Sequence, residues 1–280
     1  MYYISFGCSY IDGTGAFRVP WGLQMIPALF LIALIPLLPR SPRWLASKDR
    51  WEEALDVLAA VHAKGDRSSP TVQAEYTMIQ EDIRDYTNSS YFDLIKPNMR
   101  TRTIVGVSCQ IWSQLTGMNV MMYYISYVFQ MAGLTGSANL ISSSIQFIIN
   151  VVMTVPALIW LDTWGRRNTF LVGSTLMMIF MFAIGGTLAT YAKILPPNQR
   201  TTQAVSMLIS GPPSKAVIAC TYLFVASFAP TWGPAGWVYA PEIYPNRVRG
   251  KAMGIATAGN WAFNFALGYF TPPAFAQIYW

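Results

Sequence analysis

The chain has 280 residues, of which 53% are hydrophobic and 11% are charged, with a net charge of +6. Soluble domains carry about 25% charged residues, so this composition excludes an ordinary soluble globular protein and favours a bundle embedded in a membrane. The positive balance does not indicate nucleic-acid binding, because helical membrane proteins gather Lys and Arg on one side and no basic stripe with interleaved aromatic residues occurs.

The first predicted membrane span covers about residues 21–38. The apolar piece before it, residues 1–12, is too short to cross a bilayer. No signal-peptide pattern is present, since Met1 leads directly into an apolar run without a basic segment. We expect the chain to be a fragment, because it opens on half a span and its last span stops at Pro272-Pro273.

A polar block follows over residues 39–102, and its pattern predicts two amphipathic helices. Between residues 51 and 61, apolar side chains recur at i, i+3, i+4 and i+7. We expect Asp49 to cap this helix, with Glu52 completing a capping box. A second helix is predicted over residues 70–86, because Pro70 suits its first turn.

Five further apolar segments are predicted to cross the membrane. Fifteen of the 19 Lys and Arg residues lie in the polar block, in the loop before residue 168 and at residues 247–251. An alternating topology puts all fifteen on one face, which the positive-inside rule identifies as cytoplasmic. The five segments are 103–131, 138–161, 168–191, 216–240 and 251–275.

The first of these segments carries uncharged polar side chains around a glycine. Gln114 and Asn119 flank Thr116-Gly117 in a run without any charge. Amides at membrane depth are costly unless they pair with each other, with water or with a ligand. In a regular helix the two amides point about 140° apart, so they share a cavity only if the helix unwinds at Thr116-Gly117. The pattern predicts a broken helix that lines a pathway for a polar ligand.

Other kinds of chemistry find no support in the sequence. Cys8, Cys109 and Cys220 are far apart in apolar surroundings, which is not the spacing of a disulfide framework or a metal site. The single histidine, His62, lies on a predicted amphipathic helix, where a solvated position is expected. No paired catalytic carboxylates, nucleophile–base arrangement or phosphate-binding loop is visible. We predict no enzymatic activity, no catalytic residue and no metal.

Four sequence motifs occur in order along the chain. They are residues 39–45, Gln114 to Asn119 followed by Tyr123-Tyr124, Asp162 with Gly165-Arg166-Arg167, and Trp237 with Pro241-Glu242, Pro245, Arg249 and Asn260-Trp261. Together they resemble the motifs of the sugar porter family of the major facilitator superfamily, most closely fungal hexose transporters. The resemblance covers essentially the whole chain, and one departure is Arg40, where the family motif PESPRWL has Glu.

The resemblance implies an all-α fold, a polytopic membrane helix bundle. It places the chain in the C-terminal half of a major facilitator superfamily fold, with a cytoplasmic helical linker. The chain would run from late helix five into helix eleven, and the N-terminal half of the carrier would lie outside it. The implied domains are residues 1–38 (the end of helix five and helix six), 39–102 (the linker) and 103–280 (helices seven to eleven).

The same resemblance implies transport of a monosaccharide, a hexose, by alternating access in a multi-pass protein of the plasma membrane. The implied partners are the sugar, the lipid bilayer and the missing N-terminal half, with no nucleic acid. No cofactor is implied. The acidic residue associated with proton coupling in this family lies on the first helix, outside this chain. A membrane sugar sensor on the same scaffold is the alternative function.

Three sets of residues receive roles from the resemblance. Sugar recognition needs neutral amides and an aromatic face, although helix–helix pairing of the amides stays an alternative. Lipid-facing tyrosines, a fixed kink and membrane-anchoring charges are the alternatives for the other two sets. The sugar-binding set is Gln114, Asn119, Asn150, Trp237 and Asn260. The gating set is Tyr123, Tyr124, Gly233 and Pro234. The cytoplasmic charge lock is Asp162, Arg166, Arg167, Glu242 and Arg249.

Overall fold

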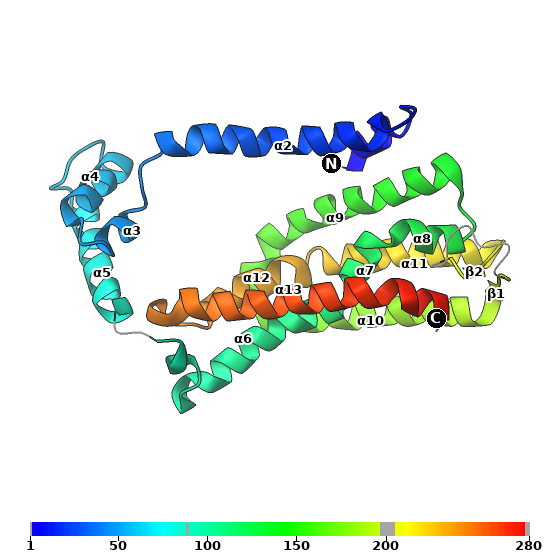
Figure 1. Ribbon diagram of the computed structural model, residues 1–280. Helices are drawn as coiled ribbons and strands as arrows, with labels where there is room; N and C mark the ends of the chain where they lie inside the picture. The colour runs from blue at the N-terminus through cyan, green and yellow to red at the C-terminus, as the bar shows by residue number, and fades with distance from the viewer. Residues whose placement is uncertain (1, 88–89, 197–204, 278–280) are drawn as a thin grey trace. The chain divides into compact units, whose positions relative to one another are not determined.

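A computed structural model describes residues 2–87, 90–196 and 205–277, and most of these residues lie in helices (Figure 1). The predicted all-α fold is therefore confirmed. The chain divides into two compact units, which are described separately. The first unit comprises residues 1–94 together with 245–250, and the second comprises residues 95–244 together with 251–280.

The first unit opens with a helix that has the length and composition of a membrane span. The helix α2 (Gly15–Leu34) continues into the 3-10 turn η1 (Ile35–Leu37), and the short helix α1 (Tyr2–Cys8) lies against it. Large apolar side chains along α2 are exposed, as lipid-facing positions require. The helix begins six residues before the predicted span and therefore includes Arg18. A charged residue is tolerated there because a long side chain near a helix end can extend its charge to the membrane interface.

Three linker helices follow and share a small core. They are α3 (Pro42–Ala46), α4 (Trp51–His62) and α5 (Pro70–Thr87), and a 3-10 turn, η2 (Tyr91–Leu94), ends the unit. The two helices predicted over 51–61 and 70–86 are thus confirmed to within one residue. Their periodic apolar side chains are the ones that become buried. This core consists of Leu45, Ala46, Ala54, Leu58, Ala59, Val72 and Ile79.

The start of α4 differs from the prediction. Asp49 has a left-handed backbone, with φ of 57°, and the N–H of Arg50 donates to the carbonyl of Leu45. This is the pattern of a residue that ends the preceding helix. Arg50 then takes the N-cap position, and its guanidinium pairs with Glu53 at 2.5 Å. The predicted capping box of Asp49 and Glu52 is wrong, because the turn uses Asp49 to close α3.

The second unit is a bundle of membrane-length helices and broken helices. Its elements follow the predicted segments in order, and α11 lies against α10 while α12 lies against α6 (Figure 1). A two-stranded hairpin, in which Lys193 pairs with Leu208, joins α10 to α11. The elements are α6 (Pro97–Leu115), α7 (Met118–Tyr123), α8 (Ile125–Met131), α9 (Gly136–Trp164), α10 (Arg166–Tyr191), β1 (Lys193–Ile194), β2 (Met207–Leu208), α11 (Pro212–Phe228), α12 (Trp232–Glu242) and α13 (Asn246–Gln277), whose first residues belong to the first unit.

Hydropathy separates two kinds of helix in this chain. Four stretches of the described residues are long and apolar enough to cross a membrane: Gly15–Leu37, Gly136–Trp164, Arg166–Tyr191 and Pro212–Glu242. The predicted spans at 103–131 and 251–275 are not in this set. These two segments carry most of the amides described below. Polar side chains lower the mean hydropathy of a helix, and in membrane proteins such side chains face the interior of the bundle.

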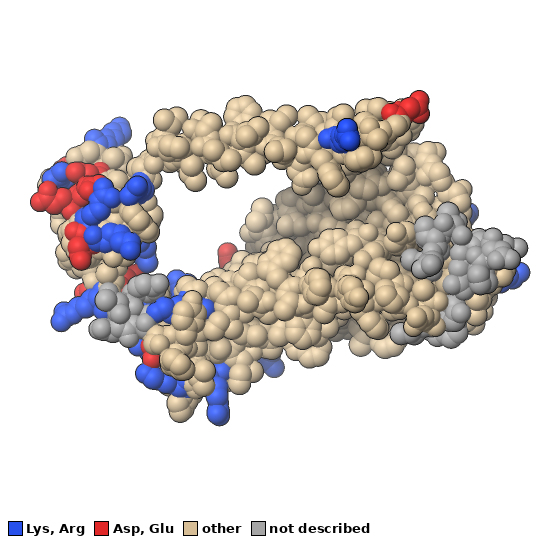
Figure 2. All heavy atoms as spheres, viewed as in Figure 1, with Lys and Arg blue, Asp and Glu red and all other residues tan. Residues whose placement is uncertain are grey.

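Charge is distributed unevenly over the surface. In Figure 2, blue and red side chains gather over the linker helices and over the end of the bundle where α6 and α13 begin. The long faces between the helix ends are almost wholly tan. This pattern suits a bundle whose sides contact lipid and whose ends contact water.

Candidate functional site

The break predicted in the polar helix lies at Gly117. The helix α6 ends at Leu115, Gly117 has a left-handed backbone with φ of 83°, and α7 begins at Met118. The side-chain amide of Asn119 donates a hydrogen bond to Oε1 of Gln114. The two amides that a regular helix would separate are therefore in direct contact.

This pair is connected to α13. The Nε2 of Gln114 donates to Oδ1 of Asn260 at 2.9 Å, and Nδ2 of Asn264 donates to Oε1 of Gln114 at 3.1 Å. Gln114 and Asn260 are buried, with 7% and 2% of their surface exposed. Asn264 was left out of the predicted set, although it lies one turn beyond Asn260 and the structure joins it to the same oxygen.

Gln110 extends the connection further and was missed by the sequence analysis. The Nδ2 of Asn260 donates to Oε1 of Gln110 at 2.8 Å and to its carbonyl oxygen at 3.2 Å. The Nε2 of Gln110 donates in turn to the carbonyl oxygen of Gly236 on α12, at 3.1 Å. One signal was available, since residues four apart lie on the same face of a helix and Gln110 precedes Gln114 by four. We call Gln110, Asn260, Gln114, Asn119 and Asn264 the amide chain.

Two residues of the predicted sugar-binding set lie apart from the amide chain. The side chain of Asn150 makes no hydrogen bond within the described part of the protein, and its carbonyl oxygen accepts the hydroxyl of Thr154 at 2.7 Å. Trp237 follows Gly236 on α12, and 48% of its surface is exposed. The structure brings together Gln114, Asn119 and Asn260, and it leaves Asn150 and Trp237 outside their hydrogen bonds.

The two tyrosines of the gating set have different surroundings. The hydroxyl of Tyr124 donates to the carbonyl oxygen of Gly268 at 2.7 Å, and its ring stacks on Tyr127 with 5.9 Å between the centroids. Tyr123 is exposed, and its hydroxyl accepts a hydrogen bond from Asn264 at 3.4 Å. Tyr123 therefore touches the amide chain, and Tyr124 joins α13 at the interruption between α7 and α8.

The pair of helices α11 and α12 is also interrupted. Within the run 231–237, Thr231 lies in the interruption, whereas Gly233 and Pro234 lie inside the first turn of α12. A proline near a helix N-terminus removes a donor that has no partner there, so it is tolerated. The interruption falls at residues 229–231, where α10 approaches closely: a Cβ on Gly173 would lie 2.2 Å from Oγ1 of Thr231.

Three residues of the predicted charge lock meet at the ends of α9, α10 and α12. The guanidinium of Arg166 pairs with Glu242 at 2.6 Å and with Asp162 at 2.9 Å. Arg167 has no ion pair among the residues that the structure describes. Arg249 belongs to the other unit. Arg166 is therefore the centre of the group, with one carboxylate on each side.

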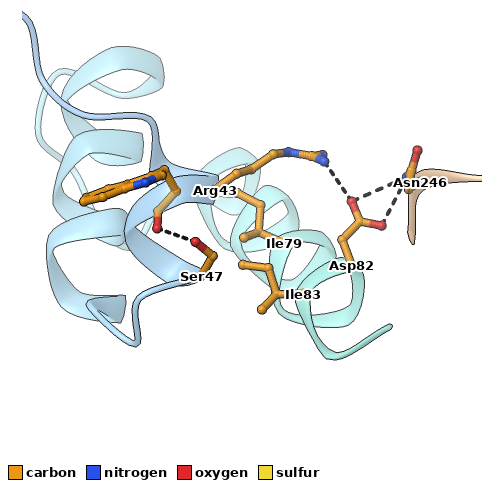
Figure 3. Close-up of a pocket in the computed structure, with 7 residues that line it drawn as sticks. Arg43, Ser47, Ile79, Asp82, Ile83 and Asn246 are labelled. Atoms are coloured by element: carbon orange, nitrogen blue, oxygen red, sulfur yellow. Dashed lines mark hydrogen bonds and ion pairs between the residues drawn. The ribbon is translucent and has the colours of Figure 1, made fainter. Parts of the chain in front are cut away.

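The first of the four motifs builds a pocket inside the first unit. The pocket has a volume of about 300 Å³, and Figure 3 shows Arg43 and Asn246 approaching Asp82 from two directions. Arg43 pairs with Asp82 at 3.0 Å, and Nδ2 of Asn246 donates to the same carboxylate at 3.1 Å. Arg40, the departure from the family motif, places its guanidinium 4.8 Å from the ring centre of Trp44, a cation–π contact. The motif thus joins α3, α5 and the start of α13.

The fold and these contacts define a polytopic helical membrane protein with uncharged amides paired in its interior. The chain belongs to the Sugar (and other) transporter family, whose sequence profile matches residues 2–280. This is a family of transporters, so the chain is not an enzyme. No group of three or more His, Cys, Asp or Glu side chains placed to hold a metal ion occurs within residues 2–87, 90–196 and 205–277.

Several known proteins are similar over the whole chain. A high-affinity glucose transporter of Kluyveromyces lactis is 46% identical over all of this chain and 52% of its own length. The glucose transporter mfs1 of Aspergillus flavus is 46% identical over all of this chain and 55% of its own length. The chain therefore spans about half the length of these curated relatives.

Solved structures support the same fold. The partially occluded inward-open form of the xylose transporter XylE from E. coli has a TM-score of 0.67, with 22% identity over 97% of this chain and 52% of that chain. At this identity the likeness shows the fold alone. The resemblance to the sugar porter family and the fold of half a major facilitator carrier are both confirmed.

Proposed function

We propose that this chain is one half of a carrier that moves a hexose across a membrane by alternating access. The observation that carries the proposal is the contact among Gln114, Asn119 and Asn260 at a helix break. Sugar hydroxyls need neutral groups that donate and accept, and amides provide both. The glucose transporters of Kluyveromyces lactis and Aspergillus flavus support the same class of substrate.

The proposed site combines the amide chain with an aromatic face. Gln114 and Asn119 meet the hydroxyls of the sugar, Asn260 holds Gln114, and Trp237 packs its indole on the C–H face of the ring. Asn150 completes the site from α9. Tyr123 and Tyr124 serve as the gate on the outer side, and Gly233 and Pro234 contribute to gating as a hinge that moves Trp237. Residues 39–102 lie in the cytoplasm beneath a plasma membrane.

Uptake measurements test this function directly. A chimeric carrier is made in which this chain replaces the aligned part of the Kluyveromyces lactis transporter, and radiolabelled D-glucose uptake is followed in cells that lack their own hexose uptake. We expect saturable uptake that excess unlabelled hexose abolishes. Binding of glucose without flux favours a sensor, and neither binding nor flux contradicts both functions.

The ion pairs of Arg166 supply a second prediction, because we propose that they hold the inner gate shut. Glu242→Gln keeps the shape of the side chain and removes its charge. Exposed ion pairs contribute about 0–1 kcal/mol each, so the expected shift towards the inward-facing form is up to about fivefold in population. Labelling of a cysteine placed on the inner side of the chimeric carrier measures it.

Asp162→Asn is the matched control for this prediction. This substitution removes the other ion-pair partner of Arg166. The side chain of Asp162 is 80% exposed, so its ion pair with Arg166 is expected to contribute less to the lock. Equal labelling of the Glu242→Gln variant and the parent carrier contradicts the lock.

A further inference from the structure

We propose that Gln110 is a positioning residue of the sugar site: it meets no ligand itself and fixes the direction in which the amides of Asn260 and Gln114 point. The inference rests on the proposed function. Gln110 is 1% exposed and lies beneath Asn260, so a ligand does not reach it. Its influence passes through hydrogen bonds alone.

The orientation of the Gln110 amide is set by a backbone carbonyl, which can only accept a hydrogen bond. The carbonyl of Gly236 only accepts, so Gln110 must turn its NH₂ group towards it, at 3.1 Å. The oxygen of the same amide then faces the opposite side, where it accepts Nδ2 of Asn260 at 2.8 Å. An amide that is otherwise free to flip thus has one orientation only.

Asn260 transmits this orientation. Its Nδ2 donates to Oε1 and to the carbonyl oxygen of Gln110. Its Oδ1 is therefore turned to Gln114, whose Nε2 donates to it at 2.9 Å. Asn260 is 2% exposed, and both its Nδ2 and its Oδ1 are hydrogen-bonded to protein, so its contribution is to hold Gln114.

The last two members of the amide chain, Asn119 and Asn264, are half-buried. Because the NH₂ group of Gln114 donates to Asn260, Oε1 of Gln114 points away from Asn260. This oxygen accepts hydrogen bonds from both Asn119 and Asn264. Within the described residues, no hydrogen bond reaches Oδ1 of Asn119 or of Asn264. The end of the chain offers carbonyl oxygens, which are acceptors suited to the hydroxyl groups of a sugar.

The carbonyl group that fixes the orientation of Gln110 lies on α12, the helix that also carries Trp237 of the proposed site. Gly236 precedes Trp237, the indole of the proposed site, on α12. A shift of α12 that withdraws the Gly236 carbonyl from Gln110 releases the orientation of the amide chain. The same helix therefore places the aromatic face and sets the direction of the polar groups.

Glucose transport by the chimeric carrier tests the inference. Gln110→Met keeps the length of the side chain and removes both hydrogen bonds. We expect a rise of roughly tenfold in KM with little change in kcat, since the loss of hydrogen bonds to a buried amide weakens ground-state binding by this order. Gln146→Met is the matched control, because Gln146 is also fully buried and donates to a backbone carbonyl, that of Met121, outside the amide chain. Its KM should stay within about twofold of the parent value.

A double-mutant cycle separates positioning from general packing. If Gln110 acts through Asn260, then Gln110→Met adds almost nothing to KM in a carrier that already has Asn260→Leu. Effects on KM that multiply in the double variant overturn the inference. If Gln110→Met is not produced in folded form, Gln110→Asn, whose amide is one methylene too short to reach both partners, takes its place in the cycle.

The outcomes also distinguish this inference from the proposed function. Absence of glucose uptake in the parent chimeric carrier contradicts the function itself. Uptake by the parent carrier with an unchanged KM in the Gln110 variants contradicts only the positioning role.

Discussion

Gly173→Ala is expected to destabilise the chimeric carrier, whereas Gly185→Ala in the same helix is expected to leave it unchanged or slightly more stable. The added Cβ at Gly173 would lie 2.2 Å from Oγ1 and 2.6 Å from Cβ of Thr231, so α10 and the start of α12 must separate. Overpacking of this kind costs about 1–3 kcal/mol. At Gly185 nothing lies within 4 Å of the new Cβ, and Ala is favoured over Gly in a helix by up to about 1 kcal/mol.

Thermal unfolding of the detergent-purified variants measures this difference, with the two variants compared at the same protein concentration. Because both carry the same chemical change in α10, helix propensity is matched between them. A melting temperature of Gly173→Ala equal to that of Gly185→Ala would show that the close contact at the break does not exist.

Gln114→Leu is expected to reduce glucose uptake at low substrate concentration by at least about a hundredfold. The substitution removes three side-chain hydrogen bonds, to Asn119, Asn260 and Asn264. Each buried polar group left without its partner costs about 1–3 kcal/mol, and every 1.4 kcal/mol is a factor of ten. Measurement of kcat/KM for D-glucose in the chimeric carrier tests the expectation.

Thr175→Val is the control for this second prediction. It also removes a polar group from a membrane helix, but the hydroxyl of Thr175 is exposed and bonds only to the carbonyl of Leu171 in its own helix. Uptake should stay within about twofold of the parent value. Retention of full kcat/KM by Gln114→Leu would contradict the placement of Gln114 in the sugar site.

The features that the sequence predicted correctly are local. The linker helices follow from their apolar period, and the break at Gly117 follows from two amides that a continuous helix would have separated. The predicted cap at Asp49 failed on a competing local demand, the turn that ends α3. Gly233 and Pro234 lie just after the interruption between α11 and α12, because a proline signals a helix start as well as a helix break.

Gln110 was missed for a different reason. Its partners lie on Gly236 and Asn260, which are 126 and 150 residues away, and no pattern in a single sequence reports a pairing at that distance. The same limit applies to Asn264. An amide in a membrane helix indicates that some polar partner exists, and only the packing of α6, α12 and α13 identifies it.

The central members of the amide chain, Gln110, Asn260 and Gln114, are hydrogen-bonded to one another. In the proposed site, an incoming hydroxyl group meets the acceptor oxygens of Asn119 and Asn264 directly, whereas one that takes over an N–H group now bonded to Gln114 only exchanges one bond for another. The net gain on binding is then smaller than the number of contacts suggests. For a carrier this is an advantage, because cargo that is held loosely leaves readily on the far side. Side chains that re-pair with one another on departure would also speed the return of the empty protein, which would make modest affinity a condition of rapid turnover.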